Sequence, residues 1–316
     1  MIKKVFLFIS MAGAAVNAQI ITQNFGSGAN AFSIDFVEIG NPGNAPDTSG
    51  NPNPAGSVSY GYNIGKYEIS RDMIEKGNSA GGLGIVLFDM EGWGFAAGNN
   101  GVNRPATGVT WFAAAKFVNY LNISQGKQAA YNFDESGNFQ KWGSGQYSGS
   151  NQFRNKDAYY FLPSIDEWYK AAYGSLSGIW YDFPSGSDRS PTAVSGGTSD
   201  DTAVYGGQSG LADITNVGGV SPFGTMAQGG NVWEWNETAF DGINDTAFEN
   251  RENRGGSFMD GVASLGLESL PTLYMGVDPG YIDLHIGFRV ASVPEPSAFL
   301  LLAIGLGALA LVRRRS

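Results

Sequence analysis

The sequence predicts a single domain of short strands and few helices joined by many turns. The 316-residue chain contains 46 glycines and 13 prolines, residues that are typical of turns. Aromatic residues make up 13% of the chain and supply large flat side chains for a core. No proline-rich or serine-rich linker divides residues 30–291. Little regular secondary structure within one domain is therefore expected.

Two regions have the pattern of strands. Residues 32–39 (FSIDFVEI) alternate apolar and polar side chains, which is typical of a half-buried strand. Residues 58–69 (VSYGYNIGKYEI) predict two short strands. Between these regions, residues 41–57 are rich in Asn, Pro, Gly and Ser, so a surface loop is expected there.

The first of two helical segments is residues 109–122. Thr110 is suited to cap its N-terminus, because a threonine hydroxyl can accept a hydrogen bond from a free backbone N–H. Apolar residues recur at helical spacing and form one stripe. They are Phe112, Ala115, Val118 and Leu121.

The second helical segment is residues 162–174. Ser164 and Glu167 have the Ser-x-x-Glu spacing of a capping box. Ile165, Trp168 and Ala172 share one apolar face, and Gly174 stands at the expected C-terminal cap. Beyond residue 175 the chain is expected to be almost entirely loop and short strand.

Charge and composition exclude several kinds of chemistry. The 19 basic and 29 acidic residues give a formal net charge of -10, without a basic stripe for nucleic acid. Cysteine is absent, which removes disulfides, thiol nucleophiles and thiolate metal sites. His285 is the single histidine, so a metal site made of several histidines is also excluded.

The N-terminus predicts export. Lys3 and Lys4 precede an apolar run at residues 5–16, and small residues follow up to Ala18. This is the pattern of a secretory signal peptide at residues 1–18, cut by signal peptidase after Ala18. The mature domain, residues 19–292, is then expected to work outside the cytoplasmic membrane.

The C-terminal segment, residues 293–316, predicts sorting. Pro294, Glu295 and Pro296 precede an apolar run at residues 298–312, and the basic cluster Arg313, Arg314 and Arg315 follows. The run is short of the roughly 20 residues that span a bilayer, and its basic end should stay cytoplasmic. The order resembles the PEP-CTERM sorting signal, which implies a short transmembrane helix and cleavage by an exosortase-type enzyme. An ordinary tail anchor is the alternative.

Six motifs follow one another in the middle of the chain. They are Gly65-Lys66-Tyr67-Glu68-Ile69, Arg104-Pro105-Ala106-Thr107-Gly108-Val109-Thr110-Trp111, Phe161-Leu162-Pro163-Ser164-Ile165-Asp166-Glu167-Trp168, Gly229-Gly230-Asn231-Val232-Trp233-Glu234-Trp235, Arg254-Gly255-Gly256-Ser257-Phe258 and Ile286-Gly287-Phe288-Arg289-Val290-Ala291. In this order and spacing they resemble the formylglycine-generating enzyme family, also called the sulfatase-modifying-factor domain. The resemblance covers roughly residues 33–292.

The resemblance implies an α+β, C-type-lectin-like fold with little regular secondary structure. It also implies a core held by the strands around Trp233 and Arg254. Relatives that make formylglycine use a pair of cysteines that hold copper, and iron-dependent relatives use histidines from an added helical domain. This chain has neither, so the activity does not carry over with the fold.

Glu234 is the main candidate for a buried charged site. Trp233 and Trp235 should share one face of a strand, with Glu234 on the other face. A buried carboxylate needs a cation or an arginine, and Arg254 and Arg289 are the candidates.

The family resemblance offers calcium as the alternative partner of Glu234. Some relatives bind calcium here, which would use the backbone carbonyls of Gly230 and Val232 with the Glu234 carboxylate. The side-chain ligand usual in such relatives is replaced by Ala227.

The function expected from these features is that of an exported, surface-sorted, non-catalytic binding or structural module. Its setting would be the cell envelope or an exopolysaccharide matrix, with a glycan or a surface protein as partner. Residues 181–223 and 260–283 are candidate binding loops, in which Tyr205, Tyr274 and Tyr281 could stack on a ligand. The alternative is an enzyme on the same fold that uses residues other than cysteine.

Overall fold

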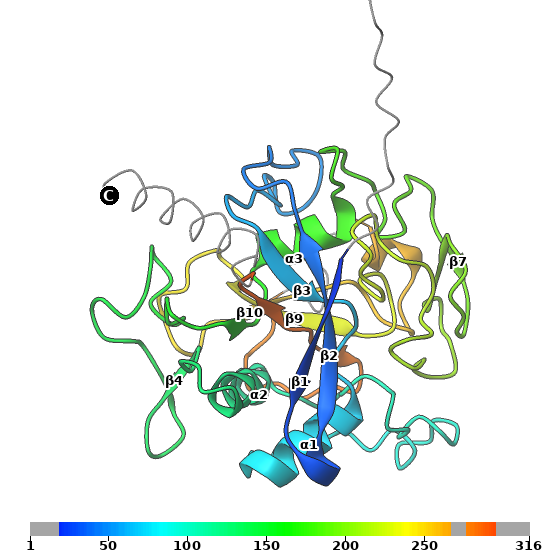
Figure 1. The fold of residues 1–316 in the computed structure, drawn as a ribbon. Helices are drawn as coiled ribbons and strands as arrows, with labels where there is room; N and C mark the ends of the chain where they lie inside the picture. Colours follow the sequence, from blue (N-terminus) through cyan, green and yellow to red (C-terminus); the bar gives the residue numbers. More distant parts are fainter. Residues whose placement is uncertain (1–18, 267–275, 295–316) are drawn as a thin grey trace, which may run out of the picture.

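The main sheet brings the N-terminal and C-terminal strands of the domain together. The computed structural model describes residues 19–266 and 276–294. Five strands pair throughout in antiparallel fashion, in the order β1-β2-β3-β12-β6 (Figure 1). Their bounds are β1 Ile20–Phe25, β2 Phe32–Ile39, β3 Tyr62–Gly65, β12 Ala291–Ser292 and β6 Tyr160–Phe161. The last strand of the domain, β12, thus lies inside the sheet between β3 and β6. The C-terminal segment therefore follows directly from a strand that is paired on both sides.

The predicted strand at residues 32–39 is confirmed as β2. Phe32, Ile34 and Phe36 are buried on its inner face, as the alternation requires. The sequence analysis did not predict its partner β1. In this edge strand, polar and largely exposed residues separate the apolar ones. The region 58–69 forms one strand, β3, and not the two that were predicted. The other residues of this region have irregular backbone. One of them, Ile69, bonds through its N–H to the carbonyl of Phe288 outside any strand.

A second sheet lies behind the first and is centred on β9, Trp233–Ala239. Strand β10, Arg251–Arg254, pairs with it in antiparallel fashion, and β11, Ile286–Gly287, pairs in parallel. Two short pairs complete the strands: β4 Asn132–Phe133 with β5 Phe139–Gln140, and β7 Thr192–Ala193 with β8 Thr202–Ala203. The region 181–223 is otherwise irregular, as predicted.

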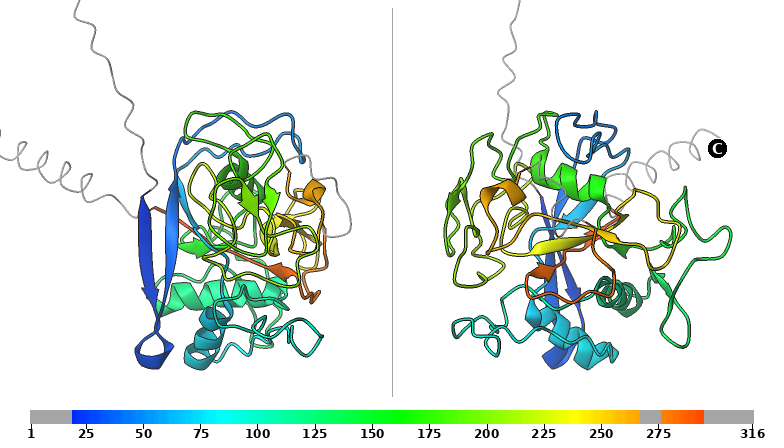
Figure 2. Two further views of the ribbon diagram at one scale, coloured as in Figure 1. Left: turned by 90° about the vertical axis from the view of Figure 1, so that its right-hand side faces the viewer. Right: turned by 180° about the vertical axis from the view of Figure 1, so that it is seen from behind.

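Three α-helices and two short 3-10 helices occur in the described residues. They are α1 Arg71–Gly81, α2 Trp111–Ser124, α3 Ile165–Tyr173, η1 Gly28–Asn30 and η2 Val262–Ser264. Thr110 caps α2, and Ser164 forms the predicted capping box with Glu167 at the start of α3. Figure 2 shows β1 and β2 along one side of the domain, with α1 and α2 at the end where these strands connect.

Helix α1 was missed by the sequence analysis. Ser70 caps it by accepting from the N–H of Met73, and Gly82 ends it in the left-handed region at φ 62°. The signal was weak because the helix contains Gly77, Asn78 and Gly81, which lower its intrinsic helix propensity. Its packing explains Gly77, since a Cβ there would lie 3.0 Å from the Phe117 ring.

Tryptophan side chains fix β9 within the core. The indole N–H of Trp111 donates to the carbonyl of Asn236, and that of Trp235 donates back to the carbonyl of Val109. The indole N–H of Trp233 donates to the carboxylate oxygen Oδ2 of Asp260, over 2.8 Å. Each tryptophan therefore buries a large apolar surface while its polar atom stays satisfied.

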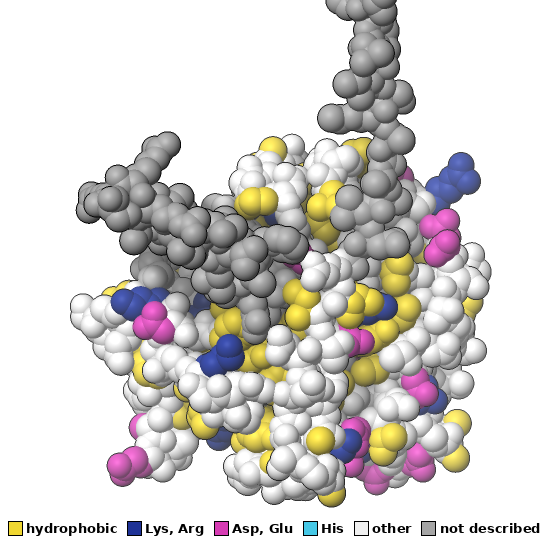
Figure 3. Space-filling model, in the orientation of Figure 1, with side chains coloured by type: hydrophobic (Ala, Val, Ile, Leu, Met, Phe, Trp, Pro, Cys, Tyr) yellow, Lys and Arg dark blue, Asp and Glu magenta, His cyan; other side chains and the backbone are white. Residues whose placement is uncertain are grey.

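The predicted α+β fold with little regular structure is confirmed. Among residues 19–266 and 276–294, no helix combines the length and apolar character needed to cross a membrane. On the face shown in Figure 3, Lys and Arg side chains are scattered among uncharged and acidic ones. This face has no continuous basic stripe.

Candidate functional site

The sequence motifs converge on Glu234 in strand β9. Its side chain is completely buried. Arg289, from the last motif, donates Nε–H to Oε2 and Nη2–H to Oε1, each over 2.6 Å. The indole of Trp168, from α3, donates to Oε2 over 2.7 Å. Both carboxylate oxygens are thus bonded to residues of the protein itself.

Arg289 also binds the backbone around it. Its Nη1 donates to the carbonyl of Gly65 over 2.9 Å, and its Nη2 donates to that of Met226 over 2.8 Å. Arg254, the other candidate partner, lies next to Glu234 in the β9–β10 register but donates to the carbonyl of Asn51. Of the two arginines, Arg289 is the one that pairs with Glu234.

The residues proposed for calcium do not form an evident cation site. Glu234 directs its oxygens at Arg289 and Trp168, so binding calcium would require it to leave these donors. Within the part of the chain that the structure describes, no three Asp, Glu or His side chains gather to hold a metal. The arrangement favours the ion pair, and calcium at Gly230, Val232 and Glu234 stays a prediction.

A second carboxyl group, that of Glu68, lies beside this pair. It is 1% exposed and accepts one hydrogen bond from Nδ2 of Asn231, while its Oε1 has no partner. Asn231 adopts φ 61° and also accepts from the N–H of Ala212, which fixes its amide. Burial, reinforced by the nearby charge of Glu234, raises the pKa of Glu68 well above its usual value.

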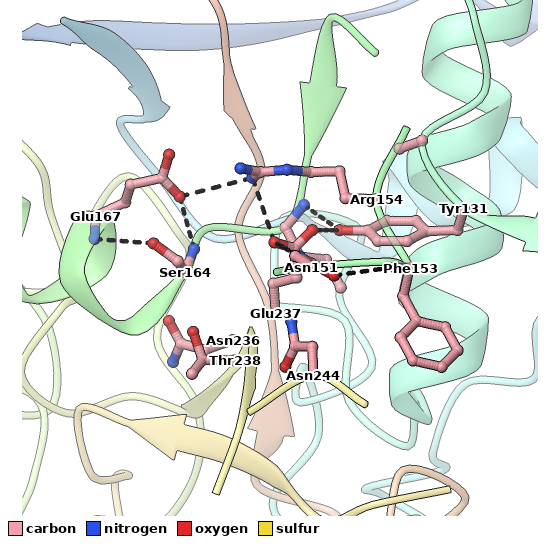
Figure 4. A network of polar contacts seen from close by, with 12 residues as sticks. Tyr131, Asn151, Phe153, Arg154, Ser164, Glu167, Asn236, Glu237, Thr238 and Asn244 are labelled. Atoms are coloured by element: carbon pink, nitrogen blue, oxygen red, sulfur yellow. Dashed lines mark hydrogen bonds and ion pairs between the residues drawn. The ribbon is translucent and has the colours of Figure 1, made fainter. Parts of the chain in front are cut away.

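A third polar centre surrounds Arg154 and was not found from the sequence. Its guanidinium lies 3.3 Å from Oε2 of Glu237 and 3.9 Å from Oε2 of Glu167 (Figure 4). It also lies over the Phe161 ring. Burial raises the pKa of Glu237, and the positive charge of Arg154 partly offsets this effect. Arg154 lies in an irregular segment outside the six motifs, so no sequence signal marked it.

Both carboxylates of this centre accept hydrogen bonds from the protein at each oxygen. Glu167 accepts from the Tyr60 hydroxyl at Oε1 and from the Ser164 N–H at Oε2. Glu237 accepts from the Tyr131 hydroxyl at Oε1 and from the Asn151 amide at Oε2. These contacts tie β9 and α3 to the segments that carry Tyr60 and Asn151.

A cavity of about 220 Å³ opens onto this network. Arg154, Asn151, Lys156 and Tyr60 contribute polar groups to its wall, and Val293 closes one side. Val293 is the residue after β12, and its N–H bonds to the carbonyl of Tyr159. The cavity therefore adjoins the point where the C-terminal segment leaves the domain.

The remaining candidate residues lie apart from these centres. Tyr205 is only 9% exposed and donates to the carbonyl of Pro191, so it is a packing residue. Tyr281 is 45% exposed, and His285 is bonded through Nδ1 to Asp283. Tyr274, the signal peptide up to Ala18, and the sorting residues Glu295, Pro296, Arg313, Arg314 and Arg315 lie outside the described residues; Pro294 is exposed.

Fold and motifs define a C-type-lectin-like domain of the formylglycine-generating-enzyme type, joined to a sorting signal. Residues 37–293 match the sulfatase-modifying factor enzyme 1-like domain, and the chain belongs to this family. Residues 292–316 match the PEP-CTERM protein-sorting motif, which implies export, sorting to the cell envelope or surface, and processing by an exosortase. A search of curated proteins found no match.

Solved structures share the fold. Treponema denticola variable protein 1 superposes with a TM-score of 0.59 at 18% identity, over 87% of this chain and 99% of that one. CarF has a TM-score of 0.59 at 21% identity, with 83% and 99% covered. PvdO from Pseudomonas aeruginosa has a TM-score of 0.53 at 15% identity, with 86% and 98% covered. At these identities the likeness extends to the fold alone.

Proposed function

We propose that the mature chain is a non-catalytic binding or structural module, displayed in the cell envelope or an exopolysaccharide matrix. The family domain supplies a rigid core, and the sorting motif supplies the route to the surface. Glycans or surface proteins are the proposed partners, because this setting offers both.

The observation that carries the proposal is that donors of the protein itself hold the buried carboxylates. Glu234, Glu167 and Glu237 each use both oxygens to accept hydrogen bonds from the protein. A general acid or base must instead reach a substrate proton directly or through one water. Glu68, the remaining buried carboxyl group of this region, is only 1% exposed. These groups are thus placed to support the fold.

The absence of cysteine supports the same conclusion. The chain contains none, so the copper-binding cysteine pair of formylglycine-forming relatives has no counterpart. An exported protein could have kept such residues in an oxidising compartment. The fold has here been retained without the chemistry of those relatives.

Processing at both ends completes the proposal. Signal peptidase would cut after Ala18, one residue before β1 begins at Ile20. The apolar run 298–312 would hold the chain transiently in the membrane until an exosortase cuts near Pro294-Glu295-Pro296. Release or transfer to the surface would follow.

A direct test of the non-catalytic assignment uses the purified protein, supplied with copper and a peptide that contains a sulfatase cysteine motif. Mass spectrometry should detect no aldehyde product above a control without protein. An aldehyde signal that grows with protein concentration would contradict the assignment and favour the enzyme alternative.

A further inference from the structure

Strand β1 forms one edge of the main sheet, and its outer side is open. Figure 2 (left) shows it as the outermost strand, with β2 between it and the rest of the sheet. It pairs with β2 over six consecutive residues, from Ile20 to Phe25, without a bulge. An open edge of this kind presents unpaired N–H and C=O groups with which another chain can pair.

The hydrogen bonds of β2 show which backbone groups of β1 are unpaired. The carbonyl of Asp35 accepts from the N–H of Lys66, which lies on the β3 side. Because successive residues of a strand bond to opposite sides, Phe36 bonds toward β1, where it faces Ile21. The residues of β1 whose N–H and C=O groups point away from β2 are therefore Ile20, Thr22 and Asn24.

The opposite edge of the sheet, β6, is protected by a side chain. Asn122 of α2 donates to the carbonyl of Tyr160 and accepts from its N–H, over 2.8 and 3.0 Å. At β1, the described residues provide such a contact at the end of the strand, where Gln125 donates to the carbonyl of Asn24. The middle of this edge, around Thr22, is left open to solvent.

Strand β1 also lacks the features that keep edge strands apart. Natural proteins protect such edges with charged residues, prolines or bulges. Residues 19–34 contain neither a charged residue nor a proline, and the pairing of β1 with β2 is unbroken. Two copies of this chain, each of net charge -10, can therefore approach through β1 without placing like charges opposite each other.

We propose that β1 pairs in antiparallel fashion with β1 of a second copy of the chain, so that the main sheet continues through a dimer. A twofold axis at Thr22 fits this pairing, because residues opposite each other must lie on the same face of the sheet. Thr22 then exchanges two N–H···O=C bonds with Thr22 of the second copy, and Ile20 pairs with Asn24. The pairing also covers Ile20, which is 50% exposed in the single chain. This inference does not depend on the proposed function.

A single introduced thiol tests the contact directly, because the chain has no cysteine. In the paired strands the two Thr22 Cα atoms should lie about 5.5 Å apart, within the range that a disulfide bridges. We expect full-length Thr22→Cys protein in detergent micelles to form a covalent dimer under mild oxidation. Ser33→Cys is the matched control, since Ser33 is exposed opposite Asn24 on β2 and its two copies would lie about 14 Å apart.

A proline variant tests the hydrogen bonds of the pairing. Thr22→Pro removes an N–H that points away from β2, so the fold should be retained while the dimer is weakened. Sedimentation of the full-length chain in detergent should show a dimer for wild type and association at least about tenfold weaker for Thr22→Pro. Thr22→Val keeps the N–H and the shape of the side chain and should dimerise like wild type. Far-UV circular dichroism checks that both variants are folded.

The results distinguish pairing through β1 from other routes to association. A wild-type chain that stays monomeric, or a dimer that a folded Thr22→Pro variant retains, would overturn the proposal. If Thr22→Pro does not fold, the cross-linking experiment decides, and equal cross-linking of Thr22→Cys and Ser33→Cys overturns the proposal. Cross-linking of Thr22→Cys to a different protein in the natural host would assign the edge to that protein and not to a second copy.

Discussion

Arg289 holds both carboxylate oxygens of Glu234 at 2.6 Å, in a pair from which solvent is completely excluded. The remaining donors of the guanidinium bond to backbone carbonyls such as those of Gly65 and Met226. A buried ion pair is tolerated when its members are satisfied in this way. The pair joins β9 to the strands of both sheets, which explains why the family motifs meet there.

Loss of charge at Glu234 should destabilise the domain strongly. Glu234→Gln keeps the shape of the side chain but leaves Arg289 buried without its counter-ion, which costs about 3–5 kcal/mol. Urea unfolding monitored by tryptophan fluorescence measures the change. The loss should be the same in EDTA and in calcium, because Arg289 and Trp168 already bind both oxygens of Glu234.

Glu135→Gln provides the control for this experiment. Glu135 is an exposed loop carboxylate, so its neutralisation should change the free energy of unfolding by less than about 0.5 kcal/mol. A calcium-dependent rise in wild-type stability that disappears in Glu234→Gln would instead establish the calcium site at Gly230, Val232 and Glu234.

Removal of Arg154 should make stability depend on pH. Arg154→Met leaves Glu237 and Glu167 buried without their shared cation, and the pKa of Glu237, already raised by burial, should rise further. A carboxyl group whose pKa is raised in the folded state contributes fully to the stability of the protein below its unfolded pKa. This contribution is lost as the pH rises through the folded pKa. The free energy of unfolding of Arg154→Met should therefore fall further below that of wild type between pH 4.5 and pH 8, until the difference is about 3 kcal/mol.

A matched control for the pH dependence of Arg154→Met is the same substitution at the exposed Arg189. Arg189→Met should behave like wild type throughout the pH range. If the free energy of unfolding of Arg154→Met lies below that of wild type by the same amount at every pH, the variant has lost packing on Phe161 and not a charge interaction.

More of the fold than of the polar centres could be predicted from the sequence. Periodicity and caps identified β2, α2 and α3, because Thr110 and Ser164 are local signals that need no tertiary contact. A buried Glu234 was expected to need a cation or an arginine, but calcium and two arginines all fitted. Only the tertiary structure shows Arg289 bonded to it. Arg154 acts through neighbours far away in the sequence, such as Glu237, so no local pattern could mark it.

Neutralising Glu68 should stabilise the protein, and more so at higher pH. Its folded pKa is raised by burial and by Glu234, so stability is lost as pH rises above the usual range for Glu. Glu68→Gln is isosteric, can still accept from Asn231, and never ionises. The melting temperature of the variant should exceed that of wild type at pH 8 and approach it at pH 4.5. A variant less stable than wild type at pH 8 would show that Glu68 is charged and paired.

The last prediction concerns sorting. Pro294 is exposed immediately after Val293, whose N–H bonds to the carbonyl of Tyr159, so the motif starts directly after a residue that is bonded to the domain. Prolines at 294 and 296 disfavour a helix, which suits an extended stretch that a processing enzyme can reach. In the natural host, the mature protein should therefore lack residues beyond roughly Pro296 and occur at the surface.

Replacing Pro294, Glu295 and Pro296 by alanine should leave the full-length form in the inner membrane. Cell fractionation followed by mass spectrometry of the C-terminal peptide distinguishes the two forms. The same replacement at the exposed residues 134–136 is the control, because it alters a loop without touching the tail. If wild-type cells contain mainly full-length protein with Arg313–Arg315 intact, the segment is a plain anchor. The 15-residue apolar run would then span the membrane by thinning the bilayer locally, a response expected of short hydrophobic segments.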